Sequence, residues 1–218
     1  MSSVVIVGGH GKVALRLAEA LSGRGHSVRS LIRKQEQGAD VEDSGAQPYL
    51  LDIEGSDAGD FADAFGGADA VVFSAGGGGD GNVERKRTVD LEGSLKSIEA
   101  AKQRGIRRFV QVSAMGVDEP VADDAAPAWR AYVEAKRDAD VALRASGLDW
   151  TIVRPGALTD GPATGAVQVG DRVPRGEISR TDVAAVIVAV LEDDSTIGAQ
   201  FELVSGDQTI PDAIASLR

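Results

Sequence analysis

The chain has 218 residues, of which 43% are hydrophobic and 26% charged, with no cysteine and only two histidines. This length and composition are typical of a folded globular protein, so we expect residues 1–218 to form a single domain. The 34 acidic residues exceed the 23 lysines and arginines, and the resulting formal charge of -11 disfavours nucleic acid as a partner. The lack of cysteine excludes disulfides and thiolate chemistry, and two histidines argue against a histidine-rich metal centre, so no metal site is predicted.

The amino terminus runs directly into an apolar segment at residues 1–7, without a basic region or a cleavage site. No apolar stretch approaches the ~20 residues that a membrane-spanning helix needs. We therefore expect a cytoplasmic protein without a membrane partner. Its expected partners are a small-molecule substrate and, if it is not a monomer, a few copies of itself.

The first 32 residues alternate between strand and helix patterns. Residues 4–7 are apolar and β-branched, and the apolar residues from Val13 to Leu21 have helical spacing. Residues 28–32 resume as a second strand, which completes a βαβ unit of about 30 residues with parallel strands.

The same alternation continues to the end of the chain. Further strands are predicted at residues 49–51, 70–73, 109–112, 150–153 and 200–204, and the main further helices at 83–104, 129–145, 181–191 and 211–217. Near-continuous apolar strands separated by helices indicate an α/β fold, with a doubly wound, mainly parallel sheet covered on both faces.

Two glycine-rich segments interrupt this alternation. Residues 76–80 are four glycines and an aspartate, and residues 159–177 are rich in glycine and proline with only weak strand character. Both segments follow predicted strands. Because ligands of open α/β sheets bind beyond the carboxyl ends of the strands, we expect these two loops to form walls of the site.

A glycine turn separates the first strand from the first helix, with Gly8, Gly11 and Ala14 in the spacing G-x-x-G-x-x-A. A pyrophosphate needs close backbone N–H groups and a helix amino terminus, and side chains would obstruct its approach. The pattern alone also fits a simple tight turn, but its place in the first βα turn favours a dinucleotide site. The predicted cofactor contacts in this turn are Gly8, Gly9, His10, Gly11, Lys12 and Val13. For His10, exposure to solvent is favoured over contact with a phosphate.

The end of the second strand predicts which dinucleotide binds, because an acidic residue there accepts from the ribose 2′-OH of NAD, whereas arginine pairs with the 2′-phosphate of NADP. This strand ends in Arg33 and Lys34, and residues 27–35 contain no carboxylate. NADP is therefore the predicted cofactor, with NAD as the alternative. A solvated basic pair is the competing interpretation. Asp52, after the third strand, is expected either to accept from the adenine amino group or to cap the next helix.

Tyr132 and Lys136 are four residues apart in a predicted helix, so both side chains project from one face, and Ser113 ends the strand before it. The pKa of a free tyrosine, ~10, is high for catalysis at neutral pH, and a neighbouring ammonium is expected to lower it. The Ser113 hydroxyl is expected to polarise a substrate carbonyl. The competing interpretation is a tyrosine packed on an alanine-rich helix beside a solvated lysine.

Over nearly its whole length the sequence resembles the short-chain dehydrogenase/reductase superfamily, in particular its atypical single-domain branch, which includes NmrA-like and flavin or biliverdin reductase-like proteins. The resemblance rests on the glycine turn, on Ser74, Ala75 and Gly76 after the fourth strand, on Ser113, Tyr132 and Lys136, and on residues 151–156. It implies a Rossmann-type NAD(P)-binding fold with a small carboxyl-terminal substrate cap.

The resemblance also implies roles for individual residues. Tyr132 would be the acid–base residue, Lys136 would hold the nicotinamide ribose, and Ser113 would orient the substrate. Pro155 would pass beside the nicotinamide, and residues 74–76 would contact the cofactor. Asp90 departs from the pattern, since many extended members have asparagine there as a proton-relay partner.

These observations predict an NADP(H)-dependent oxidoreductase that reduces a small carbonyl or conjugated acceptor by hydride transfer. Two other functions stay open. One is a non-catalytic NAD(P)-binding redox sensor, which Asp90 and the small cap support. The other is a flavin or quinone reductase, whose acceptor needs no protein acid.

Overall fold

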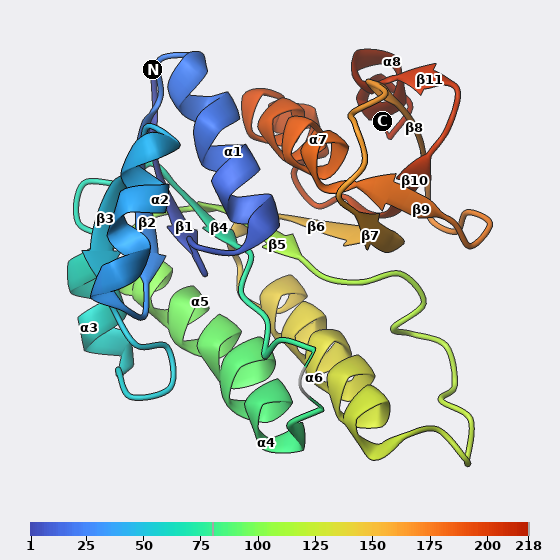
Figure 1. Ribbon diagram of the computed structural model, residues 1–218, viewed down its shortest axis with the longest axis horizontal. Helices are drawn as coiled ribbons and strands as arrows, with labels where there is room; N and C mark the ends of the chain where they lie inside the picture. The colour runs from blue at the N-terminus through green and yellow to red at the C-terminus, as the bar shows by residue number, and fades with distance from the viewer. Residues whose placement is uncertain (80, 218) are drawn as a thin grey trace.

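The computed structural model describes residues 1–79 and 81–217 and consists of alternating strands and helices (Figure 1). The first part contains β1 (Ser3–Val7), α1 (Lys12–Gly23), β2 (Ser27–Ile32), η1 (Gln35–Gln37), α2 (Gly38–Asp43), β3 (Gln47–Leu50), α3 (Ala58–Ala64) and β4 (Ala70–Phe73). The middle part contains α4 (Val83–Arg85), the π-helical segment η2 (Lys86–Glu92), α5 (Gly93–Gln103), β5 (Arg108–Val112), α6 (Pro127–Arg144) and β6 (Asp149–Pro155). The last part contains β7 (Ala157–Thr159), β8 (Ala166–Gly170), β9 (Glu177–Ser179), α7 (Arg180–Glu192), η3 (Asp194–Thr196), β10 (Gln200–Ser205), β11 (Gln208–Thr209) and α8 (Ile210–Ala215).

Across the described residues, nine strands form one sheet in the order β11-β8-β10-β6-β5-β4-β1-β2-β3. The strands from β10 to β3 in this order are parallel, whereas β8 is antiparallel to both β10 and β11. β7 and β9 pair separately. This arrangement confirms the predicted doubly wound, mainly parallel sheet of a Rossmann-type fold. The strand order reverses between β1 and β4, so a crevice opens at their carboxyl ends.

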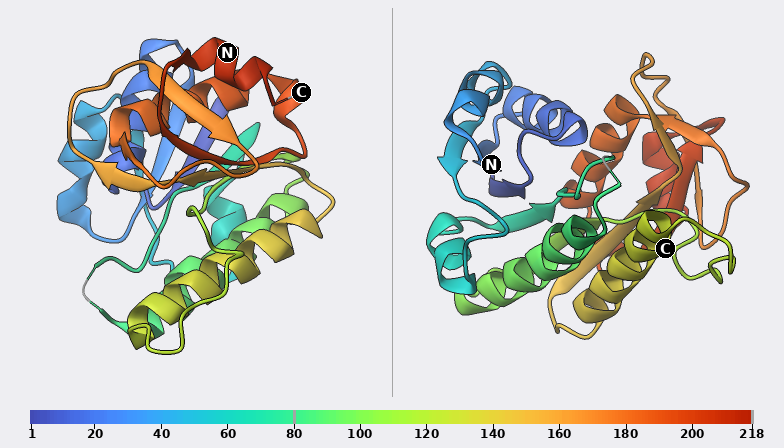
Figure 2. Two further views of the ribbon diagram at one scale, coloured as in Figure 1. Left: turned by 90° about the vertical axis from the view of Figure 1, so that its right-hand side faces the viewer. Right: turned by 60° about the horizontal axis from the view of Figure 1, so that its bottom comes forward.

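The sheet separates two hydrophobic cores. In β1, Val4 and Ile6 belong to the core under α1, α2, α7 and α8, whereas Val5 and Val7 belong to the core above α3, α5 and α6. All four side chains are at most 1% exposed. Figures 1 and 2 show these two groups of helices on opposite faces of the sheet. Because burial of one such side chain contributes roughly 1.5–3 kcal/mol, the alternation along the strand fixes which face meets which helices.

The prediction of one continuous helix over residues 83–104 is wrong in one respect. The backbone changes to π-helical hydrogen bonding over Lys86–Glu92, between α4 and α5. Such widened turns are rare and occur frequently at functional sites. In this one, Lys86 and Asp90 are both buried on the side that faces α6. Apolar periodicity does not reveal the change, since one widened turn shifts the spacing by a single residue.

The predicted irregular loop after β4 is confirmed for residues 76–79, and Asp80 lies outside the described residues. Residues 157–179, by contrast, contain the short strands β7, β8 and β9, of which β7 and β9 have three residues each. Strands of this length are too short for a period to be read from the sequence. In the part of the chain that the structure describes, no helix combines the length and the apolar character needed to cross a bilayer.

Candidate active site

The turn between β1 and α1 lies at the crevice where the strand order reverses. Gly8 has a φ of 80°, a conformation that residues with a Cβ rarely adopt. A Cβ at Gly8 would lie 2.6 Å from Ala75 Cα, and a Cβ at Gly9 would lie 2.5 Å from Ser30 Cβ. The turn therefore requires glycine because the ends of β2 and β4 approach its backbone closely.

The amino-terminal end of α1 points into this crevice. Gly11 is its N-cap residue, so no N-cap side chain accepts from the first turn, and that turn carries no acidic residue. No side chain of the N-cap or first turn therefore neutralises the partial positive charge of the helix end, which can bind an anionic group. Lys12 begins the helix and extends to Asp160, with its Nζ 2.6 Å from Oδ2, while Arg180 binds the other oxygen at 2.7 Å. Lys12 and Arg180 hold the pKa of Asp160 below its ordinary value.

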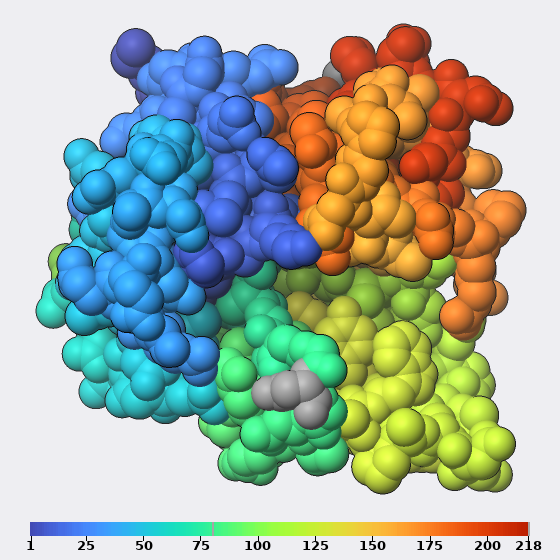
Figure 3. Space-filling model, viewed as in Figure 1, coloured from blue at the N-terminus to red at the C-terminus, as the bar shows by residue number. Residues whose placement is uncertain are grey.

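Two cavities adjoin this turn. The first has a volume of about 220 Å³ and the second about 810 Å³. Gly11, Ser74, Ala75 and Gly76 line both cavities, so they form one continuous groove. The surface is hollowed between α1 and residues 157–177 on one side and α4 and the start of α6 on the other (Figure 3). A groove of this kind suits an elongated ligand with its middle at the turn.

The predicted site residues converge on these cavities. The first is lined by Gly8, His10, Gly11, Arg33, Asp52, Ser74, Ala75 and Gly76. The second is lined by Gly11, Lys12, Val13, Ser74, Ala75, Gly76, Ser113, Tyr132, Lys136 and Pro155. Gly9 and Lys34 are not among the lining residues. Gly9 packs against β2, and Lys34 pairs with Glu36 at 3.5 Å, with its side chain 54% exposed.

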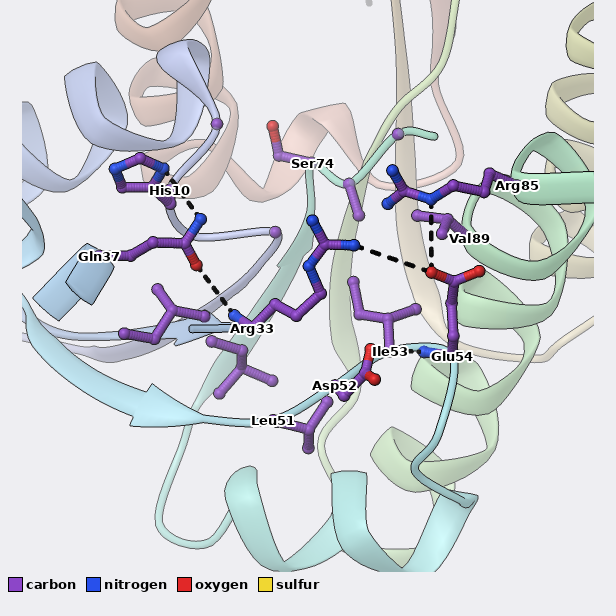
Figure 4. Close-up of a pocket in the computed structure, with 16 residues that line it drawn as sticks. His10, Arg33, Gln37, Leu51, Asp52, Ile53, Glu54, Ser74, Arg85 and Val89 are labelled. Atoms are coloured by element: carbon purple, nitrogen blue, oxygen red, sulfur yellow. Dashed lines mark hydrogen bonds and ion pairs between the residues drawn. The ribbon is translucent and has the colours of Figure 1, made fainter. Parts of the chain in front are cut away.

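His10 connects the glycine turn to the segment after β2, as Figure 4 shows. Its Nε2 lies 2.7 Å from Asp40 Oδ2 and its Nδ1 lies 3.2 Å from Gln37 Nε2. The Gln37 side-chain oxygen accepts from the backbone N–H groups of Arg33 and Lys34, each at 3.1 Å. The His10 side chain is 34% exposed, and its ring is also held by two side chains, which the sequence did not predict.

The first cavity also contains a carboxylate and an arginine that the sequence analysis missed. Glu54 Oε2 lies 3.9 Å from Arg33 Nη1 and 3.3 Å from Arg85 Nε (Figure 4). The prediction of cofactor choice rested on the absence of a carboxylate within residues 27–35, whereas Glu54 comes from the loop after β3. Asp52 accepts from the Glu54 backbone N–H at 3.2 Å. It does not cap the next helix, because Asp57 accepts from the first amides of α3.

In the second cavity, Lys136 is buried, and its ammonium is fully engaged. Its Nζ lies 3.2 Å from each of the Ala75 and Val112 carbonyl oxygens and 3.2 Å from Asp90 Oδ1. Two hydrogen bonds to carbonyl oxygens and one ion pair thus surround the ammonium. Burial opposes the charged form of Lys136, but Asp90, Tyr132 and Asp140 together outweigh it, and the pKa of Lys136 is raised above its ordinary value. The lysine predicted from the sequence is therefore a buried cation and not a solvated one.

Tyr132 is half-buried between a cation and an aromatic ring. Its ring centroid lies 5.6 Å from that of Trp129 and 5.6 Å from Lys86 Nζ. Burial raises the pKa of Tyr132 above its ordinary value and outweighs the opposite effect of Lys136. The expectation that the ammonium lowers this pKa is thus wrong in its net direction, and Tyr132 is a protonated phenol at neutral pH.

Ser113 lines the second cavity, but its hydroxyl donates to a buried carboxylate. The distance from Ser113 Oγ to Asp140 Oδ2 is 2.8 Å. Asp140 also accepts from Gln111 Nε2 at 2.6 Å and from Arg154 Nη2 at 2.8 Å. Burial raises the pKa of Asp140 despite these donors. Arg154 continues the network to Asp118 at 2.5 Å.

Sequence reasoning did not find this network. The one available signal is Arg154 itself, a charged residue that directly follows the apolar Ile152 and Val153 in β6 and is buried. A buried guanidinium requires carboxylate partners, but the sequence does not show which acidic residues supply them. Lys86 was missed for a similar reason, because only the widened turn of η2 directs it towards Tyr132.

The fold and the groove define a Rossmann-type protein with a dinucleotide-binding crevice. The chain belongs to the family of NAD(P)H-binding proteins, whose family model matches residues 8–194. A Bacillus subtilis protein named as an uncharacterized sugar epimerase, YhfK, is 40% identical over 215 residues, which cover 98% of this chain and 99% of that protein. The resemblance to the atypical branch of the short-chain dehydrogenases/reductases is confirmed.

Two solved structures have the same fold over all or nearly all of their length. A proposed NAD-dependent epimerase/dehydratase from Bacillus halodurans is 37% identical, with a TM-score of 0.91, and the match covers 99% of this chain and 100% of that one. The oxidoreductase YlbE from Lactococcus lactis is 30% identical, with a TM-score of 0.87, covering 99% and 96% of the two chains. The family is thus one of NAD(P)-binding proteins of the oxidoreductase and epimerase type.

Proposed function

We propose that this protein is an NADP(H)-dependent oxidoreductase that reduces a small carbonyl or conjugated acceptor. The observation that supports it most is that Tyr132 and Lys136 line the same cavity as the amino-terminal end of α1. A proton donor, a buried cation and an anion-binding helix end therefore meet in one groove.

The residues of the groove fit a nicotinamide dinucleotide. The bare backbone of the glycine turn and the uncapped end of α1 suit a pyrophosphate, because a Cβ at Gly8 would fill the space beside Ala75. The first cavity, with Arg33 and Asp52, would hold the adenosine half. Lys136, beside the second cavity, would exchange one of its carbonyl partners for a ribose hydroxyl. When bound, the reduced dinucleotide supplies a hydride.

In the reducing direction, Tyr132 acts as an acid. Its raised pKa keeps the proton on Oη at neutral pH, so the phenol can donate to a substrate oxygen whose carbon gains the hydride. The phenolate that remains is stabilised by the Lys136 ammonium and regains its proton from water. Asp90 keeps that ammonium charged, since the two side chains form a buried ion pair at 3.2 Å.

The second cavity also limits the substrate. Met115, Trp129 and Leu158 give it apolar walls, and Lys12, Arg175 and Arg180 add cationic groups to its lining. Aromatic and thioether side chains pack well against flat groups. A small, planar, conjugated acceptor therefore fits this part of the groove better than a large sugar nucleotide.

Replacement of Tyr132 by phenylalanine tests the proposal. Turnover with NADPH and a panel of carbonyl acceptors should fall by roughly 100-fold or more, because general-acid catalysis contributes about that much. The NADPH dissociation constant should stay nearly unchanged. Tyr49→Phe is the matched control, since Tyr49 is the other tyrosine of the chain and lies on the edge strand β3. Unchanged turnover in Tyr132→Phe would contradict the assignment of the acid.

The second candidate is a flavin or quinone reductase that needs no protein acid. The observation that favours it is the Ser113 hydroxyl, which donates to Asp140 and so does not point its proton at a substrate carbonyl. For such acceptors Tyr132→Phe would leave turnover intact. Assaying both substrate classes with the same variant therefore separates the two candidates.

A further inference from the structure

We propose that Glu54 is the residue that sets the choice between NADPH and NADH in the first cavity. This inference rests on the proposed function, because it assumes that the cavity takes the adenosine half of a nicotinamide dinucleotide. Its basis is the position of the Glu54 carboxylate between two guanidinium groups, those of Arg33 and Arg85, inside that cavity (Figure 4).

Glu54 is held in place on several sides. Its backbone N–H donates to Asp52 Oδ1, and its Oε1 accepts from Thr88 Oγ1 at 2.7 Å. Arg85 Nε lies 3.3 Å from its Oε2, and Lys96 donates to its backbone carbonyl at 3.4 Å. The carboxylate is therefore fixed both by its own loop and by α4 and η2.

The two arginines differ in how firmly they are engaged. Arg33 Nη1 is 3.9 Å from Glu54 Oε2, which is longer than a hydrogen bond, and 45% of its side chain is exposed. Arg85 is closer to Glu54 and only 26% exposed. Arg33 is thus free to turn towards an incoming anion, while Glu54 and Arg85 stay together at the cavity wall.

This arrangement acts on the two dinucleotides in opposite ways. The 2′-phosphate of NADPH would attract Arg33 but would meet the fixed negative charge of Glu54 beside it. The ribose 2′-OH of NADH, by contrast, can donate a hydrogen bond to a carboxylate. Glu54 therefore lowers the preference for NADPH that Arg33 alone would give.

Titration of the whole protein with NADPH and with NADH, followed by nucleotide fluorescence, tests this inference. Glu54→Gln keeps the length and hydrogen-bonding capacity of the side chain and removes its charge. We expect it to bind NADPH about fivefold more tightly than the wild type and NADH no more tightly, because a unit charge close to the phosphate is removed. Adenosine 2′,5′-bisphosphate and 5′-AMP, used as competitors, should reproduce the same change without any contribution from the nicotinamide half.

Glu92→Gln is the matched control. Glu92 belongs to η2, pairs with Arg87 and does not line the cavity, so this variant makes the same change in net charge outside the site. Its NADPH to NADH affinity ratio should stay within about twofold of the wild-type ratio. Circular dichroism of each variant verifies that it is folded before titration.

The outcomes separate this inference from the function on which it rests. If wild type and variants bind dinucleotides but Glu54→Gln has the same affinity ratio as Glu92→Gln, the role of Glu54 is wrong and the proposed function stands. If the folded wild type binds neither NADPH nor NADH, the proposed function fails, and the inference fails with it.

Discussion

Asp90 Oδ1 lies 3.2 Å from Lys136 Nζ, and the two side chains are 0% and 6% exposed. Asp90 also accepts from the backbone N–H of Gly77 at 2.8 Å. This pair joins η2 to α6 and to the loop after β4, so the residue that departs from the asparagine of many extended relatives is the counter-ion of the predicted catalytic lysine. Asp90 is thus part of the predicted catalytic site, and its departure from asparagine is not an observation against that site.

Loss of the negative charge at Asp90 should destabilise the protein strongly. In Asp90→Asn the Lys136 ammonium stays buried without a counter-charge, which typically costs about 3–5 kcal/mol. The free energy of unfolding in urea should fall by about that amount. The control is Asp149→Asn, which breaks the exposed pair between Asp149 and Arg107 and should change the free energy far less. Equal losses in the two variants would show that burial of the Asp90 pair has no energetic consequence.

The raised pKa of Lys136 predicts a loss of stability at alkaline pH. A group whose pKa is higher in the folded state contributes stability below its unfolded pKa, about 10.4 for lysine, and this contribution is lost as the pH rises through the folded value. The difference in unfolding free energy between wild type and Lys136→Met should therefore be constant near neutral pH and shrink above about pH 10. Urea titrations across this range measure it. A difference that grows with pH would contradict the direction of the shift.

The glycine turn should tolerate no side chain at Gly8. Gly8→Ala combines a φ of 80° with a Cβ 2.6 Å from Ala75 Cα, so backbone strain and a backbone clash add. Gly67 is a matched control because it also has a φ of 80° and, among the described residues, no atom lies within 4 Å of its added Cβ. Gly67→Ala should cost about 1–2 kcal/mol from the left-handed conformation alone.

The two glycine variants should differ in both stability and binding. Gly8→Ala should lose more unfolding free energy than Gly67→Ala and should also lose NADPH affinity. Urea unfolding and fluorescence titration measure the two properties. If both variants have the same stability and affinity, close packing at Gly8 has no role.

Ser113 and Ser94 are two buried serines of one hydrogen-bond network, and only Ser113 lines the second cavity. Ser113 Oγ donates to Asp140, and Ser94 Oγ donates to Gln111, which in turn donates to Asp140. Either serine-to-alanine change should cost about 1 kcal/mol of stability by removing one hydrogen bond.

The two serine variants should differ in their steady-state kinetics. If Ser113 orients the substrate, Ser113→Ala should lower kcat/KM by about 10-fold or more while Ser94→Ala stays near the wild-type value. Steady-state kinetics with NADPH and a carbonyl acceptor measure this. Equal kinetics in the two variants would restrict Ser113 to a structural role.

The sequence was sufficient to predict the parts of this fold that depend on local patterns. The strand at residues 70–73 and the glycine turn follow from β-branched runs and from a spacing that a tight turn requires. Ser113, Tyr132 and Lys136 were found for the same reason, since strand ends and helical faces are local features. All three line one cavity.

The missed residues depend on contacts between distant segments. Glu54 enters the first cavity only because β3 lies beside β2 in the sheet, and Asp140 reaches Ser113 because α6 packs against β6, the neighbour of β5. Neither relationship leaves a period or a motif in the sequence. The net direction of the Tyr132 pKa was also beyond the sequence, because it depends on how deeply the ring is buried.

Neighbouring residues of β1 lie on opposite sides of the sheet, which makes sequence distance a poor guide to energetic coupling in this protein. Val4 and Val5 are adjacent in the chain but belong to different cores, whereas Val4 and Ile6 share one core. Truncations at Val4 and Val5 would therefore behave almost as independent perturbations, and those at Val4 and Ile6 as cooperative ones. The central strand thus acts as a partition: each layer of helices can be redesigned without repacking the other.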